Sequence, residues 1–239
     1  MPTNDLEATT EPPESLKDTL RNITTVIFDM DGLMLDTERM SKAASQAASS
    51  QMGYPIDDTF SMRLIGHNSR DAERLFREKI ASDFPYADYL KLFYINYDQL
   101  IQDQGIPHKE GIIELLSYLK DNHICCGVAT STHHKKALQK LEMTGLLKFF
   151  QNVIAGDQVE RGKPFPDIYL KAAEILEVTP SQCLALEDSY AGVRSAHAAG
   201  IDVVMVPDLL PPIKEITALA HYVCNSLTDV LNMFQKFRR

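Results

Sequence analysis

Two aspartates separated by a single residue follow the first strongly apolar run of the chain. The run Thr24–Phe28 leads directly into Asp29, Met30, Asp31 and Gly32. Residues two apart in an extended strand point to the same side, so the two carboxylates should crowd, repel each other and lose hydration. A divalent cation with oxygen ligands, such as Mg²⁺, is the usual compensation. Alone, the pattern is equally compatible with an acidic turn that closes a strand.

Three further polar groups follow later apolar runs. Thr130 and Ser131 end the second run and open a helix, and a helix N-terminus of this kind binds phosphate. Lys163 lies in a stiff loop between a glycine and a proline, which suits a positioned positive charge. Glu187 and Asp188 close the fourth run as a second carboxylate pair. An N-cap, a surface loop and a capping aspartate would explain each group singly, but together they predict phosphoryl transfer.

Strands and helices must alternate along the chain to bring these groups together. The apolar runs are short and nearly continuous, as in parallel strands buried on both faces, and amphipathic segments separate the later ones. We therefore predict an α/β fold with a doubly wound parallel sheet, whose ligands bind at the carboxyl ends of the strands. The expected strands are Thr24–Phe28, Ile124–Ala129, Asn152–Ala155, Cys183–Leu186 and Val203–Val206, and the expected later helices are His133–Glu142, Asp167–Glu177 and Tyr190–Ala199.

A long helical interval interrupts this alternation after the first strand. About 95 residues separate the first two strands, whereas a crossover needs only a dozen or more. Apolar and aromatic residues recur there at helical spacing, a pattern that favours core packing over a ligand role. We predict an inserted α-helical cap domain over residues 38–105, with a catalytic core formed by residues 21–37 and 106–239. Residues 1–20 are expected to be a flexible acidic tail that ends in a short helix before Asn22.

The composition excludes several classes of partner. The chain of 239 residues carries 24 Lys and Arg against 33 Asp and Glu, a net charge of −9, and has no basic run. We therefore expect neither nucleic acid nor an anionic membrane as a partner. No segment approaches the ~20 continuous apolar residues that cross a bilayer. Four cysteines without a disulfide or zinc pattern favour a reduced, cytoplasmic protein, and we expect a monomer that binds a small molecule.

In chain order, the four polar groups resemble the four motifs of the haloacid dehalogenase superfamily. The likeness extends over about residues 22–230. Within the superfamily, the segments are similar to the branch of β-phosphoglucomutases and metabolite phosphatases, including sugar-phosphate and pseudouridine 5′-phosphatases. That branch has a Rossmann-like core and a helical cap after the first strand. The segments that carry the resemblance are FDMDGLMLDTE, Thr130, GKPFPDIY and LALEDSYAGV.

The resemblance implies a role for each motif residue. Asp29 would be the nucleophile that forms an aspartyl-phosphate, and Asp31 the general acid and then the general base. Thr130 and Lys163 would bind the phosphate, beside Ser131 at the same helix start. Mg²⁺ would be held by the Asp29 carboxylate, the Asp31 backbone carbonyl and Asp188, with Glu187 contributing directly or through water.

The predicted activity is that of a Mg²⁺-dependent phosphatase acting on a small phosphorylated metabolite, either a sugar phosphate or a nucleotide-like monophosphate. The alternative is a β-phosphoglucomutase-like mutase. Those mutases carry a cap histidine about ten residues past the acid/base aspartate, where this chain has Ser41. A remoter alternative is a phospho-accepting signalling domain, but such domains are about half as long and lack a cap. Gly66, His67 and Arg70 are expected to form a substrate-specificity turn, with Arg70 either pairing with a second anionic group or facing solvent.

Overall fold

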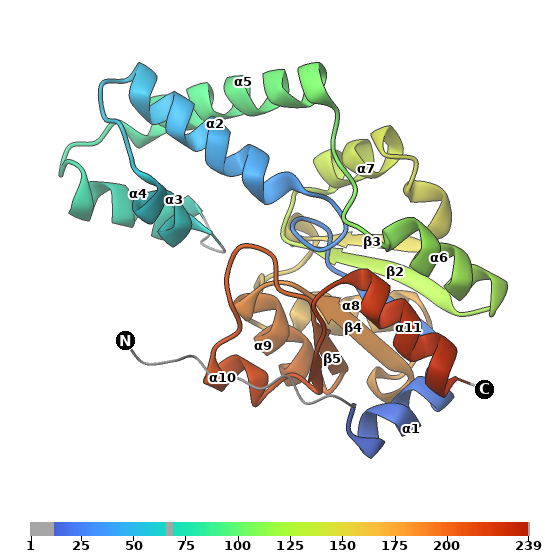
Figure 1. Cartoon of the computed structure of the whole chain (residues 1–239). Coiled ribbons are helices and arrows are strands. Elements are labelled where there is room, and N and C mark those ends of the chain that lie inside the picture. The colour runs from blue at the N-terminus through green and yellow to red at the C-terminus, as the bar shows by residue number, and fades with distance from the viewer. Residues whose placement is uncertain (1–11, 66–68, 239) are drawn as a thin grey trace.

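A six-stranded parallel sheet forms the centre of the protein (Figure 1). The computed structural model describes residues 12–65 and 69–238. Its strand order, β3-β2-β1-β4-β5-β6, places β1 at the middle, with β2 and β4 as its neighbours. The predicted fold class and its five strands are confirmed. The sixth strand, unlike the others, has only two residues and was not predicted. The strands are β1 (Thr25–Phe28), β2 (Cys125–Thr130), β3 (Asn152–Ala155), β4 (Cys183–Glu187), β5 (Asp202–Met205) and β6 (Tyr222–Val223).

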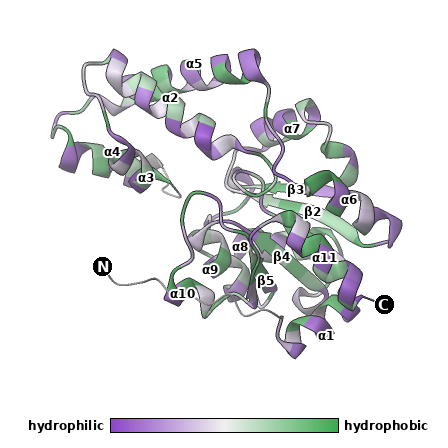
Figure 2. Cartoon of the chain, in the orientation of Figure 1, coloured by the Kyte–Doolittle hydropathy of each residue, from purple (hydrophilic) through white to green (hydrophobic). Residues whose placement is uncertain are grey.

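Helices cover both faces of the sheet. Successive strand residues point to opposite faces, so Val26 and Phe28 pack in one apolar layer while Ile27 packs in the other. The first layer is closed by α1 (Glu14–Asn22), α6 (Ile112–Asp121), α7 (His134–Met143) and α11 (Leu227–Phe237). The second is closed by α8 (Asp167–Ile175), α9 (Tyr190–Ala198) and α10 (Lys214–Thr217). Figure 2 shows the apolar strands between helices whose outer faces are hydrophilic.

The first described helix confirms the short helix expected before Asn22, but this helix packs against the sheet domain and is not part of a flexible tail. Residues 14–22 form α1, and its Leu16 and Leu20 are fully buried in the sheet layer that also contains α11. These leucines are four residues apart and therefore lie on one helix face. The acidic residues on which the prediction of a tail was based lie on the opposite, exposed face of the helix, where Glu14 pairs with Lys17.

The insertion between β1 and β2 is helical, as predicted. It contains α2 (Thr37–Gln51), α3 (Asp58–Leu64), α4 (Ser69–Lys79) and α5 (Tyr86–Gln104). These helices have a small aromatic core of their own, in which the Phe76 ring lies 4.4 Å from that of Phe84 and 4.5 Å from that of Tyr89, centroid to centroid. Among the described residues, no helix is both long and apolar enough to cross a membrane.

The chain leaves and re-enters the sheet domain at adjacent points. Leu35 on the outgoing segment and His108 on the returning one form an antiparallel bridge, flanked by two main-chain hydrogen bonds of 2.9 Å. The carboxylate of Asp208, on the loop after β5, binds both segments and is only 1% exposed. It lies 2.9 Å from Arg39 and 2.7 Å from Lys109. The two connections to the cap helices are therefore joined to each other and to the sheet domain.

Candidate active site

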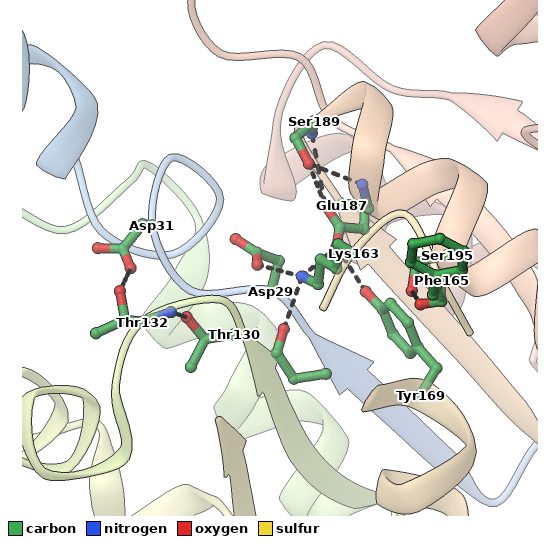
Figure 3. Close-up of polar contacts among 12 residues, drawn as sticks. Asp29, Asp31, Thr130, Thr132, Lys163, Phe165, Tyr169, Glu187, Ser189 and Ser195 are labelled. Atoms are coloured by element: carbon green, nitrogen blue, oxygen red, sulfur yellow. Dashed lines mark hydrogen bonds and ion pairs between the residues drawn. The ribbon is translucent and has the colours of Figure 1, made fainter. Parts of the chain in front are cut away.

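Asp29 follows the last residue of β1 and faces Lys163, from the loop after β3 (Figure 3). The Lys163 ammonium lies 2.5 Å from Asp29 Oδ1 and 2.8 Å from the carbonyl oxygen of Ala129. Burial raises the pKa of Asp29 to about 8; Lys163 acts to lower it, and the charge of Glu187 adds to the rise. The lysine side chain is itself only 4% exposed. The two strand ends thus hold a desolvated carboxylate against a fixed positive charge.

Glu187, at the end of β4, anchors this lysine from the other side. Its Oε1 accepts hydrogen bonds from Lys163 at 2.6 Å and from the Tyr169 hydroxyl at 2.7 Å, and its Oε2 accepts one from the Ser189 hydroxyl at 3.1 Å. The glutamate is completely buried. A Cβ at Gly192 would lie 1.9 Å from the Glu187 carboxylate, so only glycine leaves room for it. Both carboxylate oxygens are therefore held by the protein.

Asp188 is the third carboxylate of the group. It directly follows Glu187, is 8% exposed and lies against the backbone of Gly32. A Cβ at Gly32 would be 2.2 Å from Asp188 Oδ2, and the φ of +90° at this glycine is one that L-residues rarely adopt. The glycine after the aspartate pair therefore serves two needs, the sharp turn after β1 and the close approach of Asp188.

Asp31 does not crowd against Asp29, contrary to the expectation from strand geometry. Strand β1 ends at Phe28, and the Asp31 side chain lies beside Thr132 and apart from that of Asp29 (Figure 3). Its Oδ1 accepts hydrogen bonds from Lys140 and Thr37, both at 2.7 Å, and its Oδ2 accepts one from Thr132 at 2.6 Å. Burial acts to raise the pKa of Asp31, but the Lys140 charge and these hydrogen bonds outweigh it and bring the pKa below the ordinary value of 3.8. The two aspartates thus have separate lysine partners.

The predicted phosphate-binding positions at the end of β2 lie in different environments. Thr130 is 1% exposed and its hydroxyl accepts the Thr132 amide at 3.1 Å, whereas Ser131 is exposed. The helix expected to open there begins at His134, whose amide donates to Asp157 at 2.7 Å. The first amide of α7 is therefore already bound by a carboxylate, because η2 (Gly156–Gln158) brings Asp157 to it.

The carboxylates fit a divalent cation. Asp29, Glu187 and Asp188 each offer a ligand oxygen within 4.8 Å of the others, and all three residues are buried. Lys163 supplies one positive charge to Asp29 and Glu187. Negative charge therefore exceeds positive charge in a desolvated place, and hard oxygen ligands of this kind suit Mg²⁺.

A cavity of about 210 Å³ lies among the cap helices. At its edge, Glu38 on α2 also faces the sheet domain, because its Cγ lies close to Gly32. Burial raises the pKa of Glu38 to about 7, the charges of Asp31 and Asp208 add to the rise, and Lys140 opposes it. Ser41, the position of the mutase histidine, also lines the cavity. Its other polar or aromatic lining residues are Lys42, Ser45, Ser61, Tyr86, Tyr89, Phe93 and Tyr94.

Most of the proposed specificity turn lies outside the described residues. Gly66 and His67 are not described, and Arg70 is described only as part of the helical backbone at the start of α4. The prediction for these three residues therefore remains a prediction.

Five residues whose side chains bond to the site carboxylates were absent from the predicted set. Thr37, Tyr169 and Ser189 lie within the quoted motif segments, and Thr132 lies two residues after Thr130, so their neighbours provide a signal. Lys140 has no such signal, because a lysine near the end of an amphipathic helix is common for reasons of helix electrostatics.

Comparisons with known proteins identify the family of the chain. The family model described as haloacid dehalogenase-like hydrolase matches residues 26–206. A phosphorylated carbohydrates phosphatase from Thermotoga maritima is 32% identical, over 74% of this chain and 82% of its own. (DL)-glycerol-3-phosphatase 1, mitochondrial, from Arabidopsis thaliana is also 32% identical, over 91% and 72%. The crystal structure of CbbY from Rhodobacter sphaeroides in complex with phosphate superposes with a TM-score of 0.76 at 25% identity, covering 89% of this chain and 99% of that one. This chain belongs to the haloacid dehalogenase-like hydrolases.

Proposed function

We propose that this hydrolase is a Mg²⁺-dependent phosphatase of a small phosphorylated metabolite, a sugar phosphate or a nucleotide-like monophosphate, and that Asp29 carries the phosphoryl group. The observation that carries the proposal is the pairing of Asp29 with Lys163 at the strand ends, beside Asp188 and Glu187. Residues 38–105 would serve as the cap domain over this site.

Two proton-balanced steps follow from the two aspartates. Bound substrate would raise the pKa of Asp31 through the negative charge of its phosphate, and Mg²⁺ would keep Asp29 ionised, so Asp31 begins the reaction protonated. In the first step, an Asp29 carboxylate oxygen attacks phosphorus, the bond from phosphorus to the leaving oxygen breaks, and Asp31 gives its proton to that oxygen. In the second, Asp31 takes a proton from a water molecule whose oxygen attacks phosphorus, and the bond to Asp29 breaks. Inorganic phosphate leaves, and Asp31 is again protonated for the next substrate.

Lys163, Thr130 and Ser131 would hold the phosphoryl oxygens during both steps. Lys163 already lies against Asp29, and Glu187 fixes it there, so its charge needs no reorganisation. Bound Mg²⁺ would supply charge neutralisation, held by Asp29, Asp188 and the Asp31 carbonyl. Because both Glu187 oxygens already accept protein donors, we assign Glu187 mainly to positioning Lys163.

The lining of the cap cavity supports a polyhydroxylated or ring-containing leaving group. Hydroxyl groups such as those of Ser41, Ser45 and Ser61 pair with sugar hydroxyls, and the rings of Tyr86 and Tyr94 offer flat apolar surface. Phosphorylated carbohydrates and glycerol phosphate appear in the names of the two relatives described above, which supports the same class.

Replacement of Asp29 provides the direct test of the proposed phosphatase mechanism. Released phosphate would be measured over a panel of sugar phosphates, glycerol 3-phosphate and nucleoside monophosphates, with Mg²⁺ and then with excess chelator. We expect turnover only with Mg²⁺, and its loss in Asp29→Asn, with Asp36→Asn as a carboxylate control from the same loop. Near-wild-type hydrolysis by Asp29→Asn would overturn the mechanism.

Ser41 favours a phosphatase over a mutase, because its hydroxyl does not exchange protons near neutral pH as an imidazole does. The distinguishing assay supplies β-glucose 1-phosphate with a bisphosphate primer. Isomerisation to the 6-phosphate that outruns phosphate release would reverse this preference. A stable phosphoprotein after incubation with acetyl phosphate, without continuing phosphate release, would instead indicate a signalling domain.

A further inference from the structure

Lys140 lies outside the four motifs but contacts the Asp31 carboxylate directly. It comes from the last turn of α7, and its ammonium is 2.7 Å from Asp31 Oδ1. The side chain is 12% exposed, and Asp31 is its ion-pair partner. A buried lysine that meets a single carboxylate at this distance restricts where that carboxylate can point.

The same ammonium also contacts the cap. It lies 5.2 Å from the ring centroid of Tyr97, a residue of α5 that is 8% exposed. Tyr97 packs with Met40 and Ala44 of α2 in a small apolar cluster. Lys140 therefore joins Asp31 to the two long cap helices, through an ion pair on one side and a cation–π contact on the other.

The two Asp31 carboxylate oxygens accept different numbers of hydrogen bonds. Oδ1 accepts from both Lys140 and Thr37, which uses its two lone-pair directions. Oδ2 accepts only from Thr132 among the described residues, so it retains room for one more proton or donor. The arrangement selects Oδ2 as the atom that exchanges a proton with the substrate.

We propose that Lys140 is a positioning residue: with Tyr97, it ties the orientation of the Asp31 carboxylate to the docking of the cap helices, so that Oδ2 faces the leaving oxygen when the cap is in place. This inference rests on the proposed function, in which Asp31 transfers the proton.

A second lysine on α7 provides a matched control. The ammonium of Lys136 lies 3.8 Å from the ring centroid of Tyr94, so the same two helices make another cation–π contact one turn away. Lys136 is exposed, and its contact does not include Asp31. Replacing Lys136 removes a cap contact of the same kind without touching Asp31 or the cavity lining.

The test compares two substrates with different leaving groups. Glycerol 3-phosphate releases an alkoxide that needs a proton, whereas p-nitrophenyl phosphate releases a phenolate that needs little assistance. For Lys140→Met we expect kcat/KM for glycerol 3-phosphate to fall by about 10- to 100-fold, because the proton donor is misplaced. For p-nitrophenyl phosphate we expect less than about a threefold change, since general acid catalysis contributes little there. Lys140→Arg, which keeps a donor to Asp31, should show the same split with a smaller loss.

Double variants separate a positioning role from a structural one. Tyr97→Leu should also lower kcat/KM more for glycerol 3-phosphate than for p-nitrophenyl phosphate. Its effect should not add to that of Lys140→Met, because both variants remove one contact. In an Asp31→Asn background, Lys140→Met should cause no further loss on glycerol 3-phosphate. Lys136→Met should change both substrates alike.

Equal loss on both substrates in both Lys140 variants would overturn the inference, as would additive effects or a gain in glycerol 3-phosphate turnover. The proposed function fails separately, if Asp29→Asn stays active. If Asp29→Asn is inactive and Lys140→Met lowers kcat/KM equally for the two substrates, only the role of Lys140 is refuted.

Discussion

The two lysine-bound aspartates are two residues apart in the chain but are built into different parts of the molecule. Asp29, Lys163, Glu187 and Tyr169 all come from the sheet domain, and the lysine and glutamate side chains are 4% and 0% exposed. Asp31 is held by one group from the end of β2, one from α7 and one from the first cap helix, and its side chain is 19% exposed. The proposed nucleophile, Asp29, is therefore held by the core alone, whereas Asp31, the proposed proton-transfer group, is held where core and cap meet.

This difference suits the two chemical tasks. In the proposed mechanism, the attack of Asp29 on phosphorus needs the same geometry for every phosphate ester, so it gains from a rigid setting that is independent of the rest of the substrate. The proposed proton transfer depends on the leaving group, which the cap would contact, so a carboxylate held partly by the cap could respond to it.

The largest expected effect comes from removing the lysine of the more buried pair. Lys163→Met leaves the desolvated carboxylates of Asp29 and Glu187 without the positive charge that they share. In chelator, we expect the free energy of unfolding in urea to fall by about 3–5 kcal/mol. With Mg²⁺, kcat/KM should fall by roughly 10²–10³-fold on every substrate, because an electrostatic donor is lost.

Lys140→Met, at the less buried pair, is the comparison variant for that measurement. It should cost less stability and show the leaving-group dependence described above. Equal destabilisation by the two lysine variants would contradict the idea that the pairs differ in how firmly the fold holds them.

A smaller effect is expected from filling the space beside Glu187. In Gly192→Ala, the new Cβ would lie 1.9 Å from the carboxylate, so Glu187 must move and Lys163 loses its anchor. Although alanine favours helices, we expect about 1–3 kcal/mol of destabilisation from overpacking, together with reduced turnover. Gly162→Ala is the control in the lysine loop, because nothing lies within 4 Å of its Cβ. Similar unfolding midpoints for the two variants would show that the contact with Glu187 does not matter.

The smallest effect is expected at an ion pair outside the site. Because this pair is partly exposed to solvent, it should contribute less to the free energy of unfolding than the two buried pairs do. His221 lies 2.9 Å from Asp202, and both side chains are about a third exposed. A hydrogen bond from His221 lowers the pKa of Asp202, burial acts against this, and Thr19 lowers it further. The hydrogen bond to Asp202 raises the pKa of His221.

The sign of the pH dependence follows from these directions. The His221 contribution is complete below its ordinary pKa of 6.5 and is lost as pH rises through the raised value. The Asp202 contribution is present above 3.8 and is lost as pH falls through the lowered value. We expect His221→Gln to cost under about 1 kcal/mol near pH 5.5 and less above pH ~8, measured by urea unfolding at each pH. A difference that grows toward alkaline pH would contradict the assignment.

The sheet was readable from the sequence because its strands are buried on both faces and so appear as continuous apolar runs. The motif residues were readable because they follow those runs directly, where parallel strands end together. Asp29, Lys163, Glu187 and Asp188 do converge. The two-residue strand β6 carries too little pattern to be recognised. The acidic residues on the outer face of α1 concealed that this expected helix packs against the sheet domain.

The environment of Asp31 could not be predicted from local pattern. Its partners Lys140 and Thr37 lie on helices far from it or beyond a turn, and which helix residue reaches a given carboxylate depends on packing angles that no sequence period encodes. The expectation that Asp29 and Asp31 crowd each other failed for a related reason. It assumed that the strand continued through Asp31, whereas β1 ends at Phe28 and a turn follows at residues 32–34.

The bridge between Leu35 and His108 holds together the two ends of the inserted segment, and this affects how the insertion can change in evolution. The entropy lost in closing a loop depends on bringing its two ends together, and it grows only slowly with the length between them. Since the two ends already meet beside Asp208, the sheet domain can fold around this junction much as it would around a short hairpin. The residues beyond the junction are then free to change in length and composition over evolutionary time. The same site at the strand ends can in this way be combined with different inserted domains that recognise the rest of the substrate.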